Sequence, residues 1–155
     1  MSHNVTVKHV KIASIPALQA AIKELRQEGI EVDLLKNSAQ RGYRHSSHKT
    51  YPYVIRVSNA KYDIALIPDL DGSGYTPAFD QYLGEIKKEL GMLTGATQHK
   101  DVACAASSPQ ADIGKLLQRY SVCLIEQEAR NKGLSCARVF DHATKQICVN
   151  VSGYN

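Results

Sequence analysis

The sequence lacks any long apolar run. None of its stretches approaches the roughly 18 apolar residues that a membrane-spanning helix needs. The first residues, Met1-Ser2-His3-Asn4, lack the apolar core of a secretory signal peptide. We therefore expect no membrane contact and a cytoplasmic or equivalent location. With 155 residues, 43% hydrophobic and 22% charged, the composition is typical of one globular domain and not of a disordered chain.

Closely spaced cysteine pairs are also missing. Cys104, Cys123, Cys136 and Cys148 include no C-x-x-C spacing of the kind found in zinc knuckles and redox motifs. We expect free thiols, with Cys104 exposed and the other three buried as small apolar side chains. The sequence contains no Walker loop, dinucleotide fingerprint or nucleophile elbow, so we expect no cofactor and no nucleotide hydrolysis by the chain itself.

Acidic residues are absent from one long stretch. Between Leu34 and Tyr62 there is no Asp or Glu. The basic residues of this stretch are Lys36, Arg41, Arg44, Lys49, Arg56 and Lys61. It therefore carries a formal charge of +6, while the whole chain carries only +4. The basic character of the protein is concentrated in this one segment.

The same segment contains tyrosines and a glycine. Cations bind phosphate and aromatic faces stack on bases, so segment 36–56 is a candidate site for nucleic acid or a phosphorylated small molecule. The candidate ligand-binding residues are Lys36, Arg41, Gly42, Tyr43, Arg44, Lys49, Tyr51 and Tyr53. Gly42 would let the backbone approach an anion closely or adopt positive φ. The alternative is a solvated loop whose arginines pair with acids elsewhere and whose tyrosines cover the core.

The spacing of apolar residues predicts both strands and helices. Alternation of apolar and polar residues indicates strands, and apolar residues three and four positions apart indicate helices. The predicted strands are 4–12, 30–35, 51–57, 62–67, 75–79, 134–140 and 146–151, and the predicted helices are 15–28, 82–90 and 109–131. Segment 92–108, rich in Thr, Ala, Ser and Gly, is expected to be a flexible connection or insertion.

These elements predict one α+β domain over residues 1–155. We expect an antiparallel or mixed sheet of about five to seven strands, with two or three helices packed on one face. Helix-then-strand units at both ends of the chain suggest ferredoxin-like units. The alternating strands imply a sheet with one buried face and one solvated face.

Two patterns would suit a metal, but each has a simpler explanation. Residues 69–80 match the ligand spacing of an EF-hand loop, yet a predicted strand precedes them and a β-turn at 71–74 accounts for the same residues. Cys136, His142 and Cys148 form a C-x5-H-x5-C arrangement, which is not a standard zinc spacing and which cross-strand packing explains. We therefore predict no metal site.

Four short motifs carry a family resemblance. They are Met1-Ser2-His3, Arg41-Gly42-Tyr43, Tyr62-Asp63-Ile64 and Gln118-Arg119-Tyr120, the last beginning a helix that ends at Gly133. In this order, and over nearly the whole chain, the sequence resembles the hypothetical chloroplast reading frame thirty-five family of plastids, cyanobacteria, other bacteria and some phages. Residues 69–74 and 92–108 differ from the family pattern, as in a specialised, phage-type member.

The resemblance implies a role but no chemistry, because the family has no assigned catalytic residues to transfer. Its genes often lie beside those for an AAA-type ATPase, which implies an accessory or adaptor role by association. We therefore predict a non-enzymatic accessory protein that binds a protein partner, such as an AAA-type ATPase. The alternative is a binder of nucleic acid or a phosphorylated small molecule through segment 36–56. The sequence leaves the oligomeric state open, a homo-oligomer included.

Overall fold

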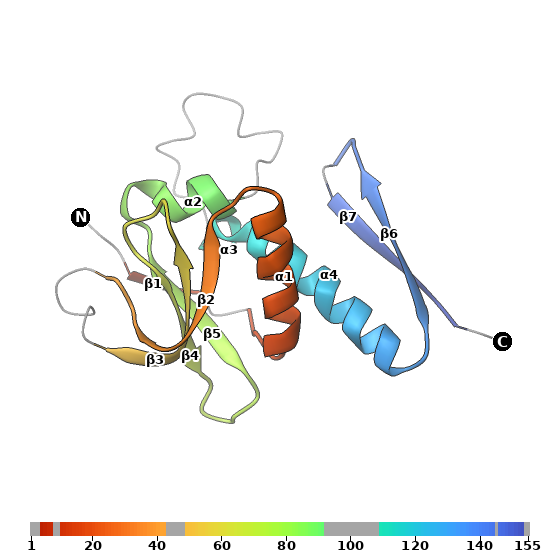
Figure 1. Cartoon of the computed structure of the whole chain (residues 1–155), viewed down its shortest axis with the longest axis horizontal. Helices are drawn as coiled ribbons and strands as arrows, with labels where there is room; N and C mark the ends of the chain where they lie inside the picture. Colours follow the sequence, from red (N-terminus) through yellow and green to blue (C-terminus); the bar gives the residue numbers. More distant parts are fainter. Residues whose placement is uncertain (1–3, 8–9, 43–48, 92–108, 145, 154–155) are drawn as a thin grey trace.

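The computed structural model describes residues 4–7, 10–42, 49–91, 109–144 and 146–153 (Figure 1). Its strands are β1 Asn4–Thr6, β2 Val32–Ala39, β3 Thr50–Val57, β4 Ile64–Pro68, β5 Tyr75–Asp80, β6 Ser135–Asp141 and β7 Gln146–Ser152. Its helices are α1 Ile15–Gln27, α2 Glu85–Leu90, α3 Pro109–Asp112 and α4 Gly114–Asn131. The α+β class is therefore confirmed.

The strands form two separate antiparallel sheets. A five-stranded sheet has the order β1-β5-β4-β3-β2, and β6 pairs only with β7. The strands that flank α1 thus lie at opposite edges of the large sheet, with three strands between them. The ferredoxin-like arrangement is not formed, because it would require the strands after α4 to return to the same sheet.

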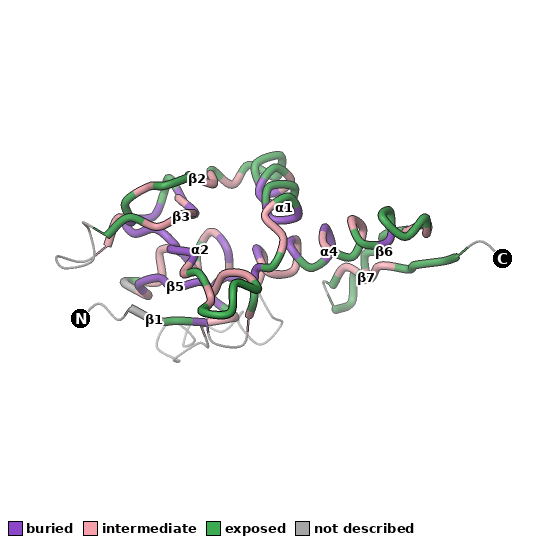
Figure 2. Tube along the Cα trace, turned by 90° about the horizontal axis from the view of Figure 1, so that it is seen from below, coloured by how far each residue is buried: buried purple, intermediate pink, exposed green. Residues whose placement is uncertain are grey.

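The core lies between one face of the large sheet and the helices. Residues directly opposite each other on neighbouring strands share a face, and the pairs Val32–Val57 and Ile55–Ile64 are both buried there. The apolar stripe of α1 packs against this face, and its buried side chains are Ala17, Leu18, Ala21, Ile22 and Leu25. Figure 2 shows the buried residues gathered between β2, β3, β5 and α1.

Several predicted boundaries were wrong for local reasons. In the predicted helix 82–90, Tyr82–Gly84 form a 3-10 helix and α2 begins only at Glu85, because Leu83 has a left-handed φ of 50°. The predicted helix 109–131 is divided at Ile113, a fully buried residue with non-helical φ, into α3 and α4. The predicted strand 4–12 ends at Thr6, although Ile12 still forms an isolated bridge with Tyr75.

Strand β2 is longer than predicted and contains an irregularity. Asn37 has a φ of 47° and lies opposite Pro52, between the register pairs Lys36–Tyr53 and Ser38–Tyr51. Proline has no N–H to donate to the neighbouring strand, and Asn tolerates the left-handed conformation. Predicted segment 92–108 lies outside the described residues. Among the described helices, none is long and apolar enough to cross a membrane.

Helices α1 and α4 are joined by hydrogen bonds at the start of α1. Ser14 caps α1, since its Oγ accepts a hydrogen bond from the Ala17 N–H. The Tyr120 hydroxyl of α4 accepts hydrogen bonds from the N–H groups of Ala13 and Ser14, at 2.9 and 3.1 Å. Ser14 Oγ in turn donates to Gln127 Oε1 at 2.9 Å. These bonds fix the position of α4 along α1.

Replacing Tyr120 by Phe tests the importance of this connection. The substitution Tyr120→Phe leaves two part-buried N–H groups without their acceptor, so we expect the free energy of unfolding to fall by about 2 kcal/mol. Urea denaturation measures this change in the free energy of unfolding. The matched control is Tyr51→Phe, a half-buried tyrosine of β3, for which we expect a change below about 0.5 kcal/mol. Equal effects of the two substitutions would contradict the prediction.

Candidate functional site

The described residues of the predicted basic site fall into two groups. Lys36, Tyr51 and Tyr53 lie on β2 and β3, with Lys49 just before β3, whereas Arg41 and Gly42 follow the end of β2. Lys36 is exposed and lies opposite Tyr53, so these two side chains share the helix-facing side with Tyr51. Tyr53 packs edge to face on Tyr75, with ring centroids 5.4 Å apart, and so contributes to the core. Lys49 is exposed, with its ammonium 5.4 Å from the centre of the Tyr51 ring.

The remaining residues of the predicted site are Arg41, Gly42, Tyr43 and Arg44. Tyr43 and Arg44 lie outside the described residues. Gly42 is half-buried, and the side chain of Arg41 donates a hydrogen bond to the Asp63 carboxylate. Among the described candidates, Lys36 and Lys49 are therefore the cations most open to a ligand.

Arg41 belongs to a buried ion cluster that the sequence did not indicate. Its Nε and backbone N–H both donate to the Asp63 carboxylate at 2.8 Å, and its Nη2 donates to the Val57 carbonyl at 3.1 Å. Arg56 Nη2 donates to the same carboxylate at 3.0 Å. Asp63 is fully buried, whereas both guanidinium groups are about one third exposed. Arg41 thus pairs with an acid of the fold, as the solvated-loop alternative expects.

The cluster keeps Asp63 ionised. Burial by itself raises the pKa of this carboxyl, but the hydrogen bonds from Arg41 and Arg56 outweigh burial and hold the pKa below its usual value. Two arginines then share one carboxylate, which leaves one positive charge at a part-exposed position. This residual positive charge is shared by the guanidinium groups of Arg41 and Arg56, and Arg56 lies on β3.

The loop with EF-hand spacing is a turn between two strands. It connects β4 to β5, and the Asp69 N–H donates to the Gly74 carbonyl at 2.9 Å. The ammonium of Lys11 lies 3.7 Å from Asp69 and 3.8 Å from Asp71, where it offsets part of their negative charge. Asp71 also accepts a hydrogen bond from the Ser73 N–H.

The cysteines differ from the expected burial. Cys123 is buried and Cys136 is half-buried, but Cys148 is exposed, so the prediction for Cys148 was wrong. The register of the C-terminal hairpin pairs Cys136 with Val151 and Cys148 with Val139, so the two thiols lie on opposite faces. Within the described part of the chain, no three His, Cys, Asp or Glu side chains are grouped to hold a metal.

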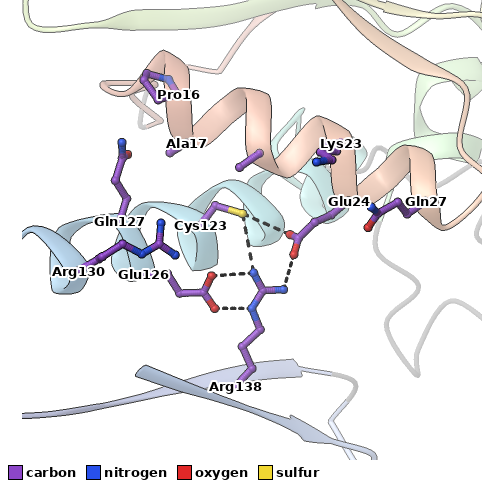
Figure 3. Close-up of a pocket in the computed structure, with 11 residues that line it drawn as sticks. Pro16, Ala17, Lys23, Glu24, Gln27, Cys123, Glu126, Gln127, Arg130 and Arg138 are labelled. Carbon is purple, nitrogen blue, oxygen red and sulfur yellow. Dashed lines mark hydrogen bonds and ion pairs between the residues drawn. The ribbon is translucent and has the colours of Figure 1, made fainter. Parts of the chain in front are cut away.

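A groove of about 470 Å³ lies between α1, α4 and β6 (Figure 3). Arg138 projects from β6 into it, and its Nη1 donates to Glu24 of α1 at 2.6 Å. Its Nη2 donates to Glu126 of α4 at 2.8 Å. The hydrogen bonds from Arg138 lower the pKa of Glu126. Arg138 therefore ties the C-terminal hairpin to both helices.

The thiol in this groove is not an activated nucleophile. Burial of Cys123, together with its hydrogen bond to Glu24 at 3.2 Å, raises its pKa to about 11. A nucleophilic cysteine needs a lowered pKa, because the thiolate is the reactive form. The groove residues Glu24, Glu126 and Arg138 are paired with one another, and their arrangement supports the position of the hairpin.

The hairpin β6–β7 has one face toward α4 and one face toward solvent. Arg138 bonds to α4, so the face of the hairpin on which Arg138 lies is the face toward α4. The other residues on this face are Cys136 and Phe140 of β6 and, by register, Ile147, Val149 and Val151 of β7. The opposite face carries Val139, Cys148 and Asn150, all exposed. Figure 2 shows this hairpin extending beyond the sheet and α1, with most of its trace exposed.

Exposed apolar side chains gather on and below this hairpin. Six large hydrophobic residues of the described chain are exposed, and three of them, Val139 at 49%, Phe140 at 46% and Val151 at 45%, lie on it. A fourth, Ile125, lies on α4. A two-stranded ribbon is marginally stable in water and normally packs on something. Val139 lies on the outward face, whereas Phe140 and Val151 lie on the face toward α4.

The comparisons with known proteins give no relative. No family model matches the chain, and neither does any curated protein or solved structure. The resemblance to the chloroplast reading frame family therefore stays a prediction.

The sequence contained part of the information about this surface. Alternation of Cys136, Arg138 and Phe140 could have placed Arg138 on the inner face of β6, where a buried partner would be required. The exposure of Val139 could not have been read from the pattern, because it depends on whether β6 joins the large sheet.

Removing the charge of Asp63 tests the ion cluster. Asp63→Asn leaves two arginines without their carboxylate, and we expect the free energy of unfolding at pH 7 to fall by about 3 kcal/mol. Asp33→Asn is the control, since Asp33 forms an exposed pair with Arg26, and it should cost less than about 1 kcal/mol.

The stability of the original protein and the stability of Asp63→Asn should depend differently on pH. The folded pKa of Asp63 is lowered, so its stabilising effect is present above the unfolded pKa of about 3.9 and is lost as the pH falls toward the folded value. The stability difference between the original protein and Asp63→Asn should therefore shrink below about pH 4. A constant difference from pH 7 to pH 3 would refute this role of Asp63.

Alkylation distinguishes the thiols. At pH 8 a thiol with a pKa of about 11 is roughly a hundredfold less ionised than a free cysteine, so Cys123 should react with iodoacetamide at least that much more slowly. Exposed Cys148 should react early in the same sample. Mass spectrometry of peptides measures both rates. Early modification of Cys123 in the folded protein would show that its thiol is accessible and ionised.

Proposed function

We propose that this protein is a non-enzymatic accessory protein that binds another protein through the outward face of its C-terminal hairpin. The observation that carries the proposal is the exposure of Val139, at 49%, in the middle of that face. The neighbouring positions Ala137, Cys148 and Asn150 are small or uncharged and also exposed. The result is a strip of exposed small or uncharged side chains, with Asp141 at one end, that another protein can cover.

The attachment of the hairpin supports this role. Arg138 anchors β6 to Glu24 and Glu126, so the strip is held in one orientation while its outward face remains open. A preformed surface loses less conformational entropy on binding than a disordered segment. The described groove, in contrast, holds a protonated thiol and mutually paired charges, which suit a scaffold better than a catalyst.

The partner class comes from the sequence resemblance. An AAA-type ATPase is the proposed partner, because the family that the chain resembles is often encoded beside one, which is an associational argument. In this arrangement the ATPase supplies nucleotide hydrolysis and the present chain supplies a contact surface.

A charged substitution on the outward face tests the proposal. Val139→Glu places a carboxylate in the centre of the strip and leaves the inner face of the hairpin unchanged. In affinity purification from the native host, we expect the protein recovered with the original chain to be reduced at least tenfold with Val139→Glu, which corresponds to about 1.4 kcal/mol. Mass spectrometry then shows whether that protein is an AAA-type ATPase.

The control is Lys36→Ala combined with Lys49→Ala, which removes the two exposed cations of the basic segment. This control should retain the partner. Unchanged recovery with Val139→Glu would count against the hairpin as contact surface. Loss of a bound nucleic acid or phosphorylated molecule in the lysine variant alone would support the alternative, binding through segment 36–56.

A further inference from the structure

Four of the strands that the structure describes have an unpaired edge. The outer strands of the large sheet are β1 and β2, and in the hairpin both β6 and β7 have one unpaired edge. An unpaired edge presents N–H and C=O groups that can pair with another strand, and proteins usually protect such edges with charges, irregularities or short length.

The edges of the large sheet carry these protections. Strand β1 has only three described residues, Asn4–Thr6. Strand β2 contains Asp33, Lys36 and the left-handed Asn37, which disturbs its regular pairing. Neither edge offers a long regular row of hydrogen-bonding groups.

Strand β7 has no such protection. Its sequence from Gln146 to Ser152 is Q-I-C-V-N-V-S, with no charge, no proline and no glycine. Three of its seven residues are β-branched and apolar, and all three lie on one face, with Cys148 and Asn150 on the other. A segment of this composition pairs readily with another strand, and exposed on an edge it is an aggregation hazard unless something covers it.

The partner strand β6 is different. Arg138 lies at its centre, between Ser135 and Asp141. Pairing β6 with β6 of a second copy about this centre would place two arginines opposite each other, which is unfavourable. The edge of β7 is therefore the edge of the hairpin that can accept a copy of itself.

A two-fold axis through Val149 makes β7 complementary to itself. Antiparallel pairing about this residue places Val149 opposite Val149, Ile147 opposite Val151 and, on the other face, Cys148 opposite Asn150. No charged residue meets another, and the apolar row of one copy continues into the row of the next. Val151, now 45% exposed, would then pack beside Ile147 of the second copy.

We propose that two copies of this chain form a dimer by antiparallel pairing of their β7 strands, which joins both hairpins into one four-stranded sheet. The pairing converts two marginal ribbons into a sheet of the size that is stable. Figure 1 shows the hairpin at the side of the molecule away from the large sheet, so the joined sheets would lie between the two cores.

The dimer concerns a different part of the hairpin from the proposed function. It uses the edge of β7, whereas the proposed partner covers the outward face around Val139. The dimer would present that face twice, side by side. Cys148 and Asn150 also belong to that outward face, so the two proposals are separated by their measurements. The mass of the purified protein reports on the dimer, and recovery of a partner with Val139→Glu reports on the outward face, so either proposal can fail alone.

The first experiment measures mass in solution with two charge variants. Size-exclusion chromatography with light scattering should give about twice the chain mass of 17.1 kDa for the original protein. Cys148→Lys combined with Asn150→Lys puts like charges opposite each other twice across the two-fold axis, and should weaken dimerisation roughly tenfold or more. Both positions are exposed, so circular dichroism should show an unchanged fold.

Mixing complementary variants tests the pairing itself. Cys148→Glu combined with Asn150→Glu should also be monomeric alone, but an equal mixture with the lysine variant should form a dimer, because every opposing pair is then of opposite charge. Val139→Glu, which lies on the outward face of β6, should leave the dimer intact.

A cross-link gives the register independently of charge. Asn150→Cys places a thiol opposite Cys148 of the second copy, so mild oxidation should give a covalent dimer on a non-reducing gel. In the control Ser152→Cys, the new thiol lies opposite Gln146 and should not cross-link. A monomeric original protein across a dilution series would overturn the proposal, and so would a dimer that persists in both charge variants. Equal cross-linking at positions 150 and 152 would overturn the stated register.

Discussion

The contact between α1 and α4 is the constraint on which the rest of the molecule depends. One face of α4 enters the core through Leu116, Tyr120 and Cys123, and the Tyr120 hydroxyl accepts hydrogen bonds from the N–H groups of the two residues just before α1. Val122 lies roughly 200° around the helix from Tyr120, yet it is also buried. Helix α4 is therefore covered on two sides, by the core on one and by the hairpin on the other.

This double coverage explains how a hairpin outside the sheet keeps a fixed place. Arg138 reaches across α4 to Glu24 on α1 and is also bonded to Glu126. Pairs that are partly shielded from water are screened less than surface pairs, so this network is more effective than an exposed ion pair. Its result is a hairpin with a fixed inner face and an open outer face, which is the basis of both proposals.

Part of the positive segment has a structural role. Arg41 and Arg56 both serve the buried carboxylate of Asp63, and Tyr53 packs on Tyr75 in the core. A run of basic residues without acids nearby in sequence can still be neutralised by an acid brought close in space. Lys36 and Lys49 are the described cations of the predicted site that remain exposed.

The sequence by itself determined the elements whose patterns are local. The helix over Ile15–Gln27 and the strands β3, β4, β6 and β7 were all predicted from the spacing of apolar residues, because this signal lies within about ten residues of the chain. The breaks at Leu83 and Ile113 were not predicted, because the apolar spacing continues through both residues and does not report their non-helical backbone.

Only the tertiary structure decided which strands pair and which charges meet. The exposure of Cys148 and Val139 depends on β6 and β7 staying outside the large sheet, and the role of Arg41 depends on Asp63, 22 positions away. A strand pattern specifies alternation but not its neighbour, because pairing is settled by contacts between distant segments. The candidate surface therefore became visible only when the whole chain was folded.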